Sequence, residues 1–324
     1  MTTSTDQLPA TSSTSSSSAP TLSVVVPAHD EGRTLGRTLA ALASAAGAEA
    51  PEVVVVANGC SDDTADVARA AGARVVELGQ ASKAAALRAG DEAATAFPRV
   101  YLDADIVLTP GTLAHLAERL REGDVHAASP SIRFDLRGSS WPVRAFYRAY
   151  AELPYVRSGL VGLGVYGMSQ EGRSRFSEFP DVTSDDLFVQ RLFAEHERGT
   201  SDGEFVVAAP RNLRNLLKVR TRTASGNAEL SRTEHHDERG AGGRPVTVDA
   251  SQDDATAAAG GSATGTAPTF DRSTSGTTSA LAKLALTRPR LLPSAAVYTA
   301  VTIASRISAR RRQTTAWQRD TSTR

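Results

Sequence analysis

The sequence predicts an α/β fold in which a mostly parallel, Rossmann-like sheet is flanked by helices. Short continuous apolar runs such as LSVVVP and EVVVVA are typical of strands that are buried on both faces. Each run is followed by a segment in which apolar residues recur at helical spacing. Because strand-like and helix-like segments alternate, the chain has the order of successive βαβ units, which form parallel sheets.

The first three strands and their helices can be placed from short sequence signals. LSVVVP is followed by leucines at helical spacing, namely Leu35, Leu39 and Leu42. EVVVVA is followed by SDDTADVARAAG, which predicts a helix with an acidic first turn and with Gly72 just past its end. RVVEL predicts the third strand, and SKAAALRAGDEAA predicts the third helix.

The fourth strand, RVYLDAD, ends on two carboxylates, Asp103 and Asp105. Thr109 and Pro110 then predict the N-cap and the first position of a helix that ends near Gly123. Ligands of open parallel sheets bind beyond the carboxyl ends of the strands. We therefore expect the two acids to lie at a ligand site.

The overall composition indicates which kinds of partner the protein is expected to lack and in which cellular compartment it is expected to lie. The chain has 324 residues, with 36 Lys+Arg and 36 Asp+Glu, so no global basic field indicates a nucleic-acid partner. Cys60 is the only cysteine, which favours a reducing environment. The first residues lack the features of a signal peptide, and no run reaches the roughly 18 apolar residues of a membrane span. We expect a cytoplasmic protein.

Composition also divides the chain into four segments. Residues 1–20 are rich in Ser and Thr and predict a disordered tail. Residues 21–230 hold the α/β pattern and predict one domain. Residues 231–279 are rich in Gly, Ala, Ser and Thr, which predicts a low-complexity disordered insertion. Residues 280–324 predict a C-terminal helical element.

The C-terminal element contains a predicted helix from Ser294 to Arg312, whose end is crowded with arginines. Its expected apolar stripe consists of Val297, Val301 and Ala304 beside Ala300, Ile303 and Ile307. Two interpretations compete. The stripe docks on protein, or it lies in a membrane interface with the arginines among anionic headgroups, which makes the protein peripheral at the inner face of the membrane. We favour docking on protein, because interfacial helices usually present larger side chains than alanine.

Two carboxylates one residue apart at a strand end, such as Asp103 and Asp105, can turn toward one ligand. Buried without a partner, they would cost on the order of several kcal/mol or stay protonated. A divalent cation resolves this cost, and oxygen ligands suit Mg²⁺ or Mn²⁺ with substrate phosphates completing the shell. The alternative is a solvated turn in which Asp105 caps a local group.

The ends of the first and second strands carry polar groups that suit a nucleoside. PAHDEG lacks the G-x-G-x-x-G and P-loop patterns, but its Glu31 can accept hydrogen bonds from a nucleoside. The alternative is an acidic helix start. In ANGCSDDT, the amide of Asn58 suits a base edge, although capping by Ser61 or Asp62 explains much of this motif. Cys60 is interpreted as a packing residue, because no cationic or histidine partner is evident.

Taken in order, PAHDE, NGCSDDT, KAAALRAG and LDAD resemble the motifs of GT-A nucleotide-sugar glycosyltransferases, most closely the inverting family 2 group. The resemblance implies the GT-A fold. It implies that Glu31, Asn58 and Asp103 contact the nucleoside, and that Lys83 reaches the nucleotide. It also implies that Asp105, together with Asp103, binds the Mn²⁺ or Mg²⁺ ion that bridges the donor diphosphate.

The catalytic base is expected in the segment PDVTSDDLFVQRLF. The family carries a Glu-Asp pair about a turn and a half of helix before an Arg-Leu, and Asp185 stands at the matching distance from Arg191. Ser184 replaces the first acid of the pair, and Asp186 is an additional acid, so the resemblance implies a catalytic role for Asp185 or Asp186. Such a carboxylate would take the proton from the acceptor hydroxyl. The alternative is a capped helix start whose acids complement the helix dipole.

The acceptor side is expected in SGLVGLGVYGMS, where closely spaced glycines such as Gly164 suggest backbone near a ligand and Tyr166 suggests a sugar platform. A glycine-rich turn into a strand is the alternative. Related enzymes often carry Gln-x-x-Arg-Trp further on. This chain lacks the Gln and the Trp, so Arg220 and Arg222 are expected to substitute for that arginine at the donor, with a solvated basic loop as the alternative.

These inferences predict a metal-dependent, inverting glycosyltransferase. It would move a sugar from a nucleotide-sugar donor to a carbohydrate or lipid-linked acceptor, in polysaccharide or glycolipid biosynthesis. Two alternatives stay open among enzymes, a retaining GT-A transferase and a sugar nucleotidyltransferase. A catalytically degenerate GT-A domain that acts as a binding or scaffold protein is the alternative outside the enzymes.

Overall fold

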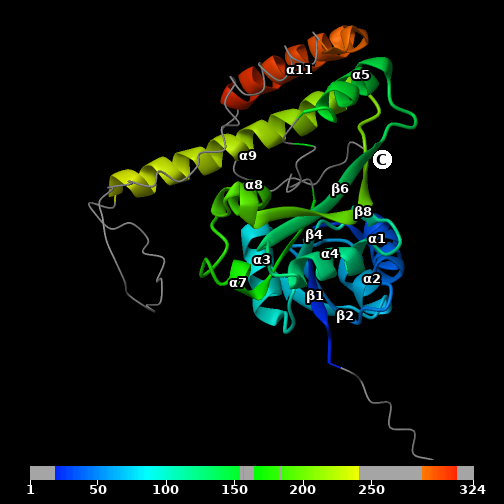
Figure 1. The fold of residues 1–324 in the computed structure, drawn as a ribbon, viewed down its shortest axis with the longest axis vertical. Helices are drawn as coiled ribbons and strands as arrows, with labels where there is room; N and C mark the ends of the chain where they lie inside the picture. The colour runs from blue at the N-terminus through cyan, green and yellow to red at the C-terminus, as the bar shows by residue number, and fades with distance from the viewer. Residues whose placement is uncertain (1–18, 154–155, 157–163, 182–183, 241–286, 312–324) are drawn as a thin grey trace, which may run out of the picture.

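The computed structural model describes residues 19–153, 156, 164–181, 184–240 and 287–311. Over these residues, an eight-stranded sheet has the strand order β3-β2-β1-β4-β7-β6-β8-β5. Its first half consists of β1 (Leu22–Ala28), α1 (Gly32–Ala45), β2 (Pro51–Asn58), α2 (Thr64–Ala70), β3 (Arg74–Leu78), α3 (Lys83–Ala93) and β4 (Arg99–Leu102). The strands β3, β2, β1 and β4 are all parallel, which confirms the predicted fold class (Figure 1).

Both faces of these strands are covered by helices. On one face, Val24 and Val26 of β1 belong to a core cluster that includes Leu35 of α1. On the other face, Val25 belongs to a cluster that includes Leu87 of α3. Successive strand residues point to opposite faces, so a strand with two covered faces is apolar at every position. The unbroken apolar runs of the sequence therefore follow from burial on both sides.

The second half of the sheet mixes strand directions. It consists of β5 (Val107–Leu108), α4 (Thr112–Arg121), β6 (Ala127–Asp135), β7 (Val165–Met168), α7 (Gln170–Arg173), α8 (Asp185–Leu192), η1 (Glu195–Glu197) and β8 (Arg198–Ala208). β7 is antiparallel to both β4 and β6, whereas β6 and β8 are parallel. In the pair of β4 with β7, Tyr101 lies opposite Tyr166.

The segment after β4 is a turn between two strands of the same sheet. β4 ends at Leu102, so Asp103 and Asp105 follow the strand and lie in the turn. Val107 and Leu108 then form β5, which pairs antiparallel with β8. The apolar residues after the acids thus return the chain to the sheet and fix the turn at both ends.

The helix after this turn begins later than predicted. α4 begins at Thr112, and its N-cap is Gly111, whose φ of 76° lies in the left-handed region. Pro110 is therefore outside the helix. The hydroxyl of Thr109 donates a hydrogen bond of 3.0 Å to the backbone carbonyl of Glu204 in β8. Thr109 ties the turn to a neighbouring strand rather than capping a helix.

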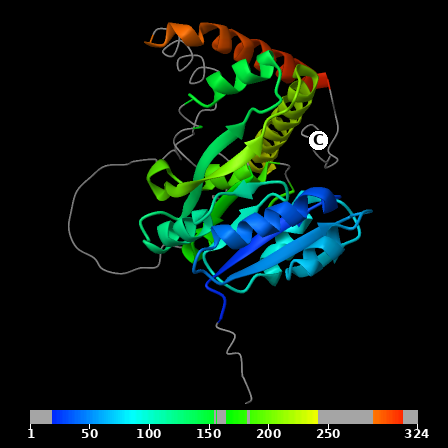
Figure 2. The ribbon, with the colours of Figure 1, turned by 90° about the vertical axis from the view of Figure 1, so that its right-hand side faces the viewer.

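A layer of helices lies beside the sheet (Figure 2). It consists of α5 (Trp141–Tyr150), α9 (Leu213–Gly240) and α11 (Leu292–Arg311), the last preceded by η2 (Pro289–Leu291). α11 packs against both α5 and α9. The ring of Tyr298 stacks on Phe146 with a centroid distance of 5.1 Å, within a cluster that also contains Tyr150. Docking of the C-terminal helix on the rest of the protein is thus confirmed.

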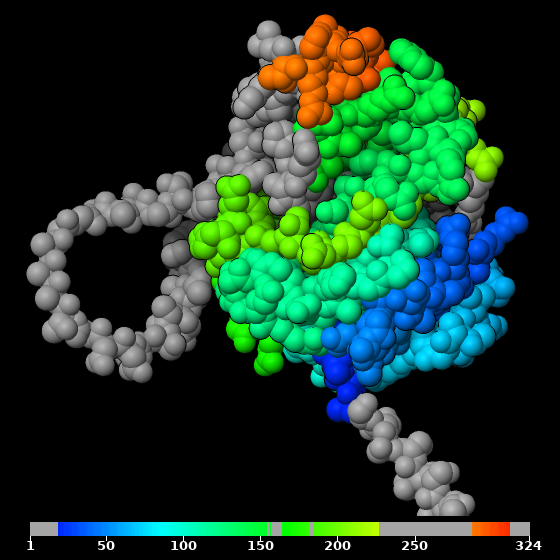
Figure 3. Space-filling model, turned by 45° about the vertical axis from the view of Figure 1, so that its right-hand side comes forward, coloured from blue at the N-terminus to red at the C-terminus, as the bar shows by residue number. Residues whose placement is uncertain are grey.

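The apolar stripe expected on α11 is only partly correct. Val301 is buried together with Ala295 and Tyr298, whereas the side chains of Ile303 and Ile307 are 54% and 48% exposed. In the space-filling view, α11 (orange) lies at the edge of the molecule against the surface that contains α5 (Figure 3). The helix therefore has two apolar stripes, of which one packs inward and the other faces outward.

The predicted segment boundaries are partly covered by the described residues. α9 continues to Gly240, so the chain is still helical where the insertion was expected to begin, at residue 231. The remainder of that insertion, residues 241–279, lies outside the described residues, as does the N-terminal tail over residues 1–18. Within the described part of the chain, no helix combines the length and the apolar character required to cross a bilayer.

Candidate functional site

Three of the predicted site residues meet at the carboxyl edge of the sheet. The Nζ atom of Lys83, at the first position of α3, lies 3.1 Å from Oδ1 of Asp103 and 2.8 Å from Oδ1 of Asp185. Asp103 follows β4, and Asp185 is the first residue of α8. The donor-side acid and the acceptor-side acid of the sequence analysis therefore share one cation, although they are distant in the chain.

The ammonium of Lys83 is a buried, fixed charge. Its side chain is 17% exposed, and that of Asp185 is 6% exposed. Burial lowers the pKa of Lys83, but the charges of Asp103 and Asp185 together outweigh it and raise this pKa above its ordinary value. Lys83 therefore stays protonated at neutral pH, next to the turn that carries the two acids.

Asp185 is held from its other side by Tyr166. The hydroxyl of Tyr166 donates a hydrogen bond of 2.9 Å to Oδ2 of Asp185. Burial, and secondly the charge of Asp185, raises the pKa of Tyr166 well above its ordinary value, so the hydroxyl stays a donor. Oδ1 of Asp185 is buried, and its partner among the described residues is the ammonium of Lys83, 2.8 Å away.

The expected role of Tyr166 as a sugar platform is not compatible with its position. The side chain is buried, and its ring stacks on Tyr101 with a centroid distance of 5.1 Å. A ring face that is covered by another ring cannot receive a sugar. Tyr166 reaches the site with its hydroxyl, which orients Asp185.

A buried ionic cluster anchors the stacked tyrosines. The hydroxyl of Tyr101 donates to Oδ1 of Asp91, and the guanidinium groups of Arg99 and Arg173 donate to the same carboxylate. Sequence reasoning missed this cluster. Its signal is a charged residue, Asp91, on the buried face of an alanine-rich helix, which requires a buried partner of opposite charge.

The amide of Asn58 is not available for a base edge, contrary to the expectation. Asn58 is fully buried, its Nδ2 donates 2.7 Å to the carbonyl of Ser82, and its Oδ1 accepts 3.1 Å from the backbone N–H of Ser82. Ser82 is also the N-cap of α3, because its hydroxyl accepts from the N–H of Ala85. Asn58 therefore fixes the start of α3, where Lys83 begins.

Glu31 and Gly164 border the same edge of the sheet. Glu31 is the N-cap residue of α1, and one of its carboxylate oxygens accepts a hydrogen bond from the hydroxyl of Thr34. The carbonyl of Gly164 accepts a 2.7 Å hydrogen bond from the N–H of Asp103. A Cβ at Gly164 would lie 2.7 Å from a side-chain carbon of Ile106, and its φ is 109°. Only glycine therefore allows this close contact with the acidic turn.

The acidic turn fits a divalent metal ion. Asp103 and Asp105 supply two carboxylates on one short turn, and the side chain of Asp105 is exposed to solvent. Carboxylate oxygens, with water and phosphate oxygens to complete the shell, are the donor set that Mg²⁺ and Mn²⁺ prefer. Lys83 contacts Asp103 through one oxygen, Oδ1.

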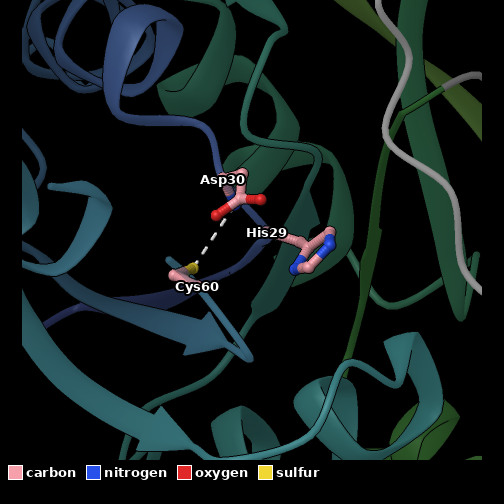
Figure 4. A group of neighbouring side chains, drawn as sticks. All are labelled: His29, Asp30 and Cys60. Carbon is pink, nitrogen blue, oxygen red and sulfur yellow. Dashed lines mark hydrogen bonds between the residues drawn. The ribbon is translucent and has the colours of Figure 1, made fainter. Parts of the chain in front are cut away.

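The loops after β1 and β2 are joined by His29, Asp30 and Cys60, which sequence reasoning did not connect (Figure 4). These types of residue bind metals, but Nδ1 of His29 lies 2.8 Å from the carbonyl of Asn58. Asp30 accepts hydrogen bonds through Oδ1 from the N–H and the hydroxyl of Ser61. Its own N–H donates to Sγ of Cys60. These contacts indicate a structural link between the loops, and they agree with the packing role expected for Cys60.

The remaining predicted residues are Asp186, at the start of α8, and Arg220 and Arg222, on α9. Asp186 follows Asp185 at the start of α8, and its charge contributes to the raised pKa of Lys83, after burial and the two nearer acids. The guanidinium of Arg220 lies over the ring of Tyr150, 5.1 Å from its centroid, within the aromatic cluster of the helical layer. Arg222 is exposed on α9.

The fold and the acidic turn together define the GT-A class of nucleotide-sugar transferase domains. Residues 23–163 match the family described as glycosyl transferase family 2. This match confirms the resemblance seen in the four sequence motifs.

A curated relative agrees with this match, and a solved structure agrees with the fold. Glycosyltransferase AglD of Haloferax volcanii is 33% identical over 120 residues, which is 34% of this chain and 19% of the relative. The chain thus matches about a fifth of the length of that relative. Mannosyltransferase PcManGT from Pyrobaculum calidifontis, solved with GDP-Man and Mn²⁺, is similar in structure. Its TM-score is 0.60 at 21% identity, over 90% of this chain and 87% of that chain, so the likeness concerns the fold.

A second solved structure is less similar. Glucosyl-3-phosphoglycerate synthase from Mycobacterium tuberculosis, solved with Mn²⁺, UDP and glucosyl-3-phosphoglycerate, has a TM-score of 0.45 at 21% identity. The match covers 57% of this chain and 70% of that chain.

Proposed function

We propose that the chain is a metal-dependent glycosyltransferase that moves a sugar from a nucleoside-diphosphate donor to a hydroxyl acceptor with inversion. The observation that carries this proposal is the shared contact of Lys83 with Asp103 and Asp185. It brings the acceptor-side carboxylate to the turn that would hold the donor. The buried Oδ1 of Asp185, which contacts the ammonium of Lys83, is the candidate proton acceptor.

The donor side consists of the acidic turn and the residues around it. Asp103 and Asp105 would hold Mn²⁺ or Mg²⁺, and the similar mannosyltransferase was solved with GDP-Man and Mn²⁺. A bound divalent ion neutralises charge on the departing diphosphate. Lys83 would add its fixed positive charge, and Glu31, at the end of β1, would accept hydrogen bonds from the nucleoside.

In the proposed reaction, Oδ1 of Asp185 takes the proton of the acceptor hydroxyl. The acceptor oxygen forms a bond to the anomeric carbon of the sugar from the face opposite the diphosphate. The bond between that carbon and the diphosphate oxygen breaks, and the nucleoside diphosphate leaves with the electron pair. Attack from the opposite face inverts the configuration. Asp186, the next residue, is the alternative base.

A donor-binding role is less well supported for Arg220 and Arg222. Arg220 is engaged with the aromatic cluster through the ring of Tyr150. A stacked arginine keeps its charge and its in-plane donors, so it remains able to bind an anion at the edge of the ring. We assign Arg220 to packing α9 against α5 within the helical layer and keep Arg222 as the candidate phosphate contact of this pair.

The test of the proposed function uses the full chain with a panel of nucleotide sugars that includes GDP-mannose and UDP-glucose. With Mn²⁺ present, we expect release of the nucleoside diphosphate and loss of this release in excess chelator. Sugar-nucleotide binding without release, even with a range of hydroxyl acceptors, would favour the scaffold alternative. A retained anomeric configuration in the product would contradict the inverting assignment.

The outward stripe of α11 supports a lipid-linked acceptor at an anionic membrane. Leu292, Ile303 and Ile307 are large, exposed apolar residues, and Arg306 and Arg310 are exposed on the same helix. The segment from residue 288 to 311 contains arginines and no acidic residue. An apolar stripe beside exposed arginines suits a surface of apolar chains and anionic headgroups. We propose peripheral membrane contact through this stripe.

A further inference from the structure

The ammonium of Lys83 occupies the place from which an acceptor hydroxyl would approach Asp185. Oδ2 of Asp185 already accepts the hydrogen bond from Tyr166. The remaining oxygen, Oδ1, lies 2.8 Å from Nζ of Lys83. A general base needs one oxygen within hydrogen-bond reach of the proton that it removes. In the conformation described here, Lys83 therefore blocks the oxygen on which the proposed reaction depends.

The side chain of Lys83 can leave one carboxylate only if another negatively charged group is close enough to receive its ammonium. Its backbone is fixed, because Asn58 holds Ser82 through two hydrogen bonds and Ser82 caps the helix that Lys83 begins. Its side chain is 17% exposed. A buried ammonium that leaves one carboxylate needs another negative partner nearby, since an unpaired buried charge is costly. The ammonium already contacts Asp103, so it lies beside the turn where a diphosphate would bind.

Tyr166 makes this movement compatible with a positioned base. Its hydrogen bond to Oδ2 does not involve Lys83, and its ring is held by the stacking on Tyr101. When Lys83 leaves Oδ1, the carboxylate of Asp185 therefore keeps its orientation. The freed oxygen then points to the volume that the ammonium occupied.

We propose that Lys83 is a latch that couples donor binding to release of the base. Without a donor, Lys83 pairs with Asp185 and blocks Oδ1. The diphosphate of the donor draws the ammonium away, and Asp185 becomes accessible to an acceptor hydroxyl only then. Lys83 and Tyr166 are positioning residues in this scheme. The inference rests on the proposed function, since it needs a nucleoside diphosphate at the acidic turn.

The latch makes an uncommon prediction for equilibrium binding. If donor binding must first break the pair of Lys83 with Asp185, then Asp185→Asn removes that cost. We expect Asp185→Asn to bind a nucleoside diphosphate about tenfold more tightly than the wild type. A tenfold change in affinity is at the low end of the coupling energies of close charge pairs. Lys83→Met should weaken the same binding, because the diphosphate loses a cation.

The deciding experiment is a double-mutant cycle on the affinity of GDP and of UDP, measured by calorimetry with Mn²⁺ present. The variants are Asp185→Asn, Lys83→Met and the combination of both, with Asp186→Asn as the control for removal of a nearby negative charge. The latch predicts that Asp185→Asn tightens binding in the wild-type background and has little effect in the Lys83→Met background. Asp186→Asn, alone and combined with Lys83→Met, should change the affinity by less than about threefold. Thermal unfolding of each variant checks that it is folded.

Two outcomes would overturn the latch while leaving the proposed function in place. One is tightening of equal size in both backgrounds, which would be a general charge effect. The other is unchanged or weaker binding by Asp185→Asn, which would mean that Lys83 and Asp185 form a static pair. If the folded wild-type chain binds neither nucleotide in the presence of Mn²⁺, the proposed function and the latch both fail.

Discussion

The hydroxyl of Tyr166 donates a 2.9 Å hydrogen bond to Oδ2 of Asp185, and this contact orients the proposed base. It depends on the register of two antiparallel strands, in which Tyr166 lies opposite Tyr101. The tyrosine thus links a core strand to the first residue of α8. Removal of the hydroxyl alone should separate orientation of the base from packing of the ring.

Tyr166→Phe keeps the stacked ring and removes the hydrogen bond. We expect kcat to fall by about tenfold, since a hydrogen bond to a charged group contributes roughly 1.5–3 kcal/mol. The KM for the donor should change little, because the hydroxyl of Tyr166 bonds to Asp185 and not to a carboxylate of the acidic turn. Steady-state kinetics give both values. Tyr101→Phe is the matched control: it removes a hydroxyl bound to Asp91, so it should lower stability more than kcat. An unchanged kcat for Tyr166→Phe would contradict the positioning role.

Asp185→Asn should lower the rate of sugar transfer by at least about 10²-fold, the usual scale for loss of a general base. Asparagine keeps the shape of the side chain but cannot take the proton of the acceptor. Single-turnover measurements with saturating donor isolate the transfer step. Asp186→Asn is the control at the neighbouring residue, and it should lower the rate of sugar transfer only slightly. A severe loss for Asp186→Asn with a mild one for Asp185→Asn would move the base by one residue.

Asp105→Asn should remove the dependence of nucleotide binding on Mn²⁺ while leaving the fold intact, because Asp105 is exposed on the turn. A ligand that binds only the folded state raises the unfolding temperature. We expect Mn²⁺ with a nucleoside diphosphate to raise the unfolding temperature of the wild type but not that of the variant. Asp66→Asn, which changes an acid that is 82% exposed elsewhere, should behave like the wild type. A full Mn²⁺-dependent shift in Asp105→Asn would refute the metal assignment.

Asp91→Asn should destabilise the protein by about 3–5 kcal/mol, because it leaves the guanidinium groups of Arg99 and Arg173 without their buried partner. Burial raises the pKa of Asp91, but hydrogen bonds from Arg173, Tyr101 and Arg99 outweigh it and hold this pKa below its ordinary value. The stabilisation is therefore complete above about pH 4 and is lost as the pH falls through the lowered pKa.

The free energy of unfolding, measured by denaturant titration at several pH values, tests both parts of the Asp91 prediction. The difference between the wild type and Asp91→Asn should be largest near neutral pH and should shrink in acid. A difference that does not depend on pH would mean that the variant acts through packing rather than through the charge. Asp66→Asn provides the control for loss of an exposed acid.

The outward stripe of α11 can be tested with vesicles that contain anionic lipid. We expect the full chain to float with these vesicles at low salt and to dissociate at high salt, because surface electrostatics are screened. The double change Ile303→Ser with Ile307→Ser should reduce flotation, since both side chains are exposed and their loss should not disturb the inward face. Leu213→Ser, at an exposed apolar residue of α9, is the matched control. Equal flotation of wild type and double variant would contradict the proposal.

Much of the fold could be predicted from local patterns. The strands β1, β2 and β3, the helices between them and the acids after β4 were placed correctly. β1 and β2 were recognisable because a strand covered on both faces is apolar along its length. Two features were not predicted correctly: the hydrogen bonds of the turn before α4, and which side of α11 packs on the protein. Thr109 bonds to the backbone of β8 instead of capping α4, and a partner strand distant in sequence cannot be read from the motif.

The sequence by itself determined the succession of strands and helices in the first half of the chain, the pair of acids at a strand end and the presence of a basic residue, Lys83, at a helix start. Only the tertiary structure decided that Lys83 contacts Asp185, that the amide of Asn58 bonds to the backbone of Ser82 and that the hydroxyl of Tyr166 bonds to Asp185. The reason is physical. Periodicity encodes which face of an element is buried, whereas the partner of a polar group depends on strand register and on how separate elements pack together.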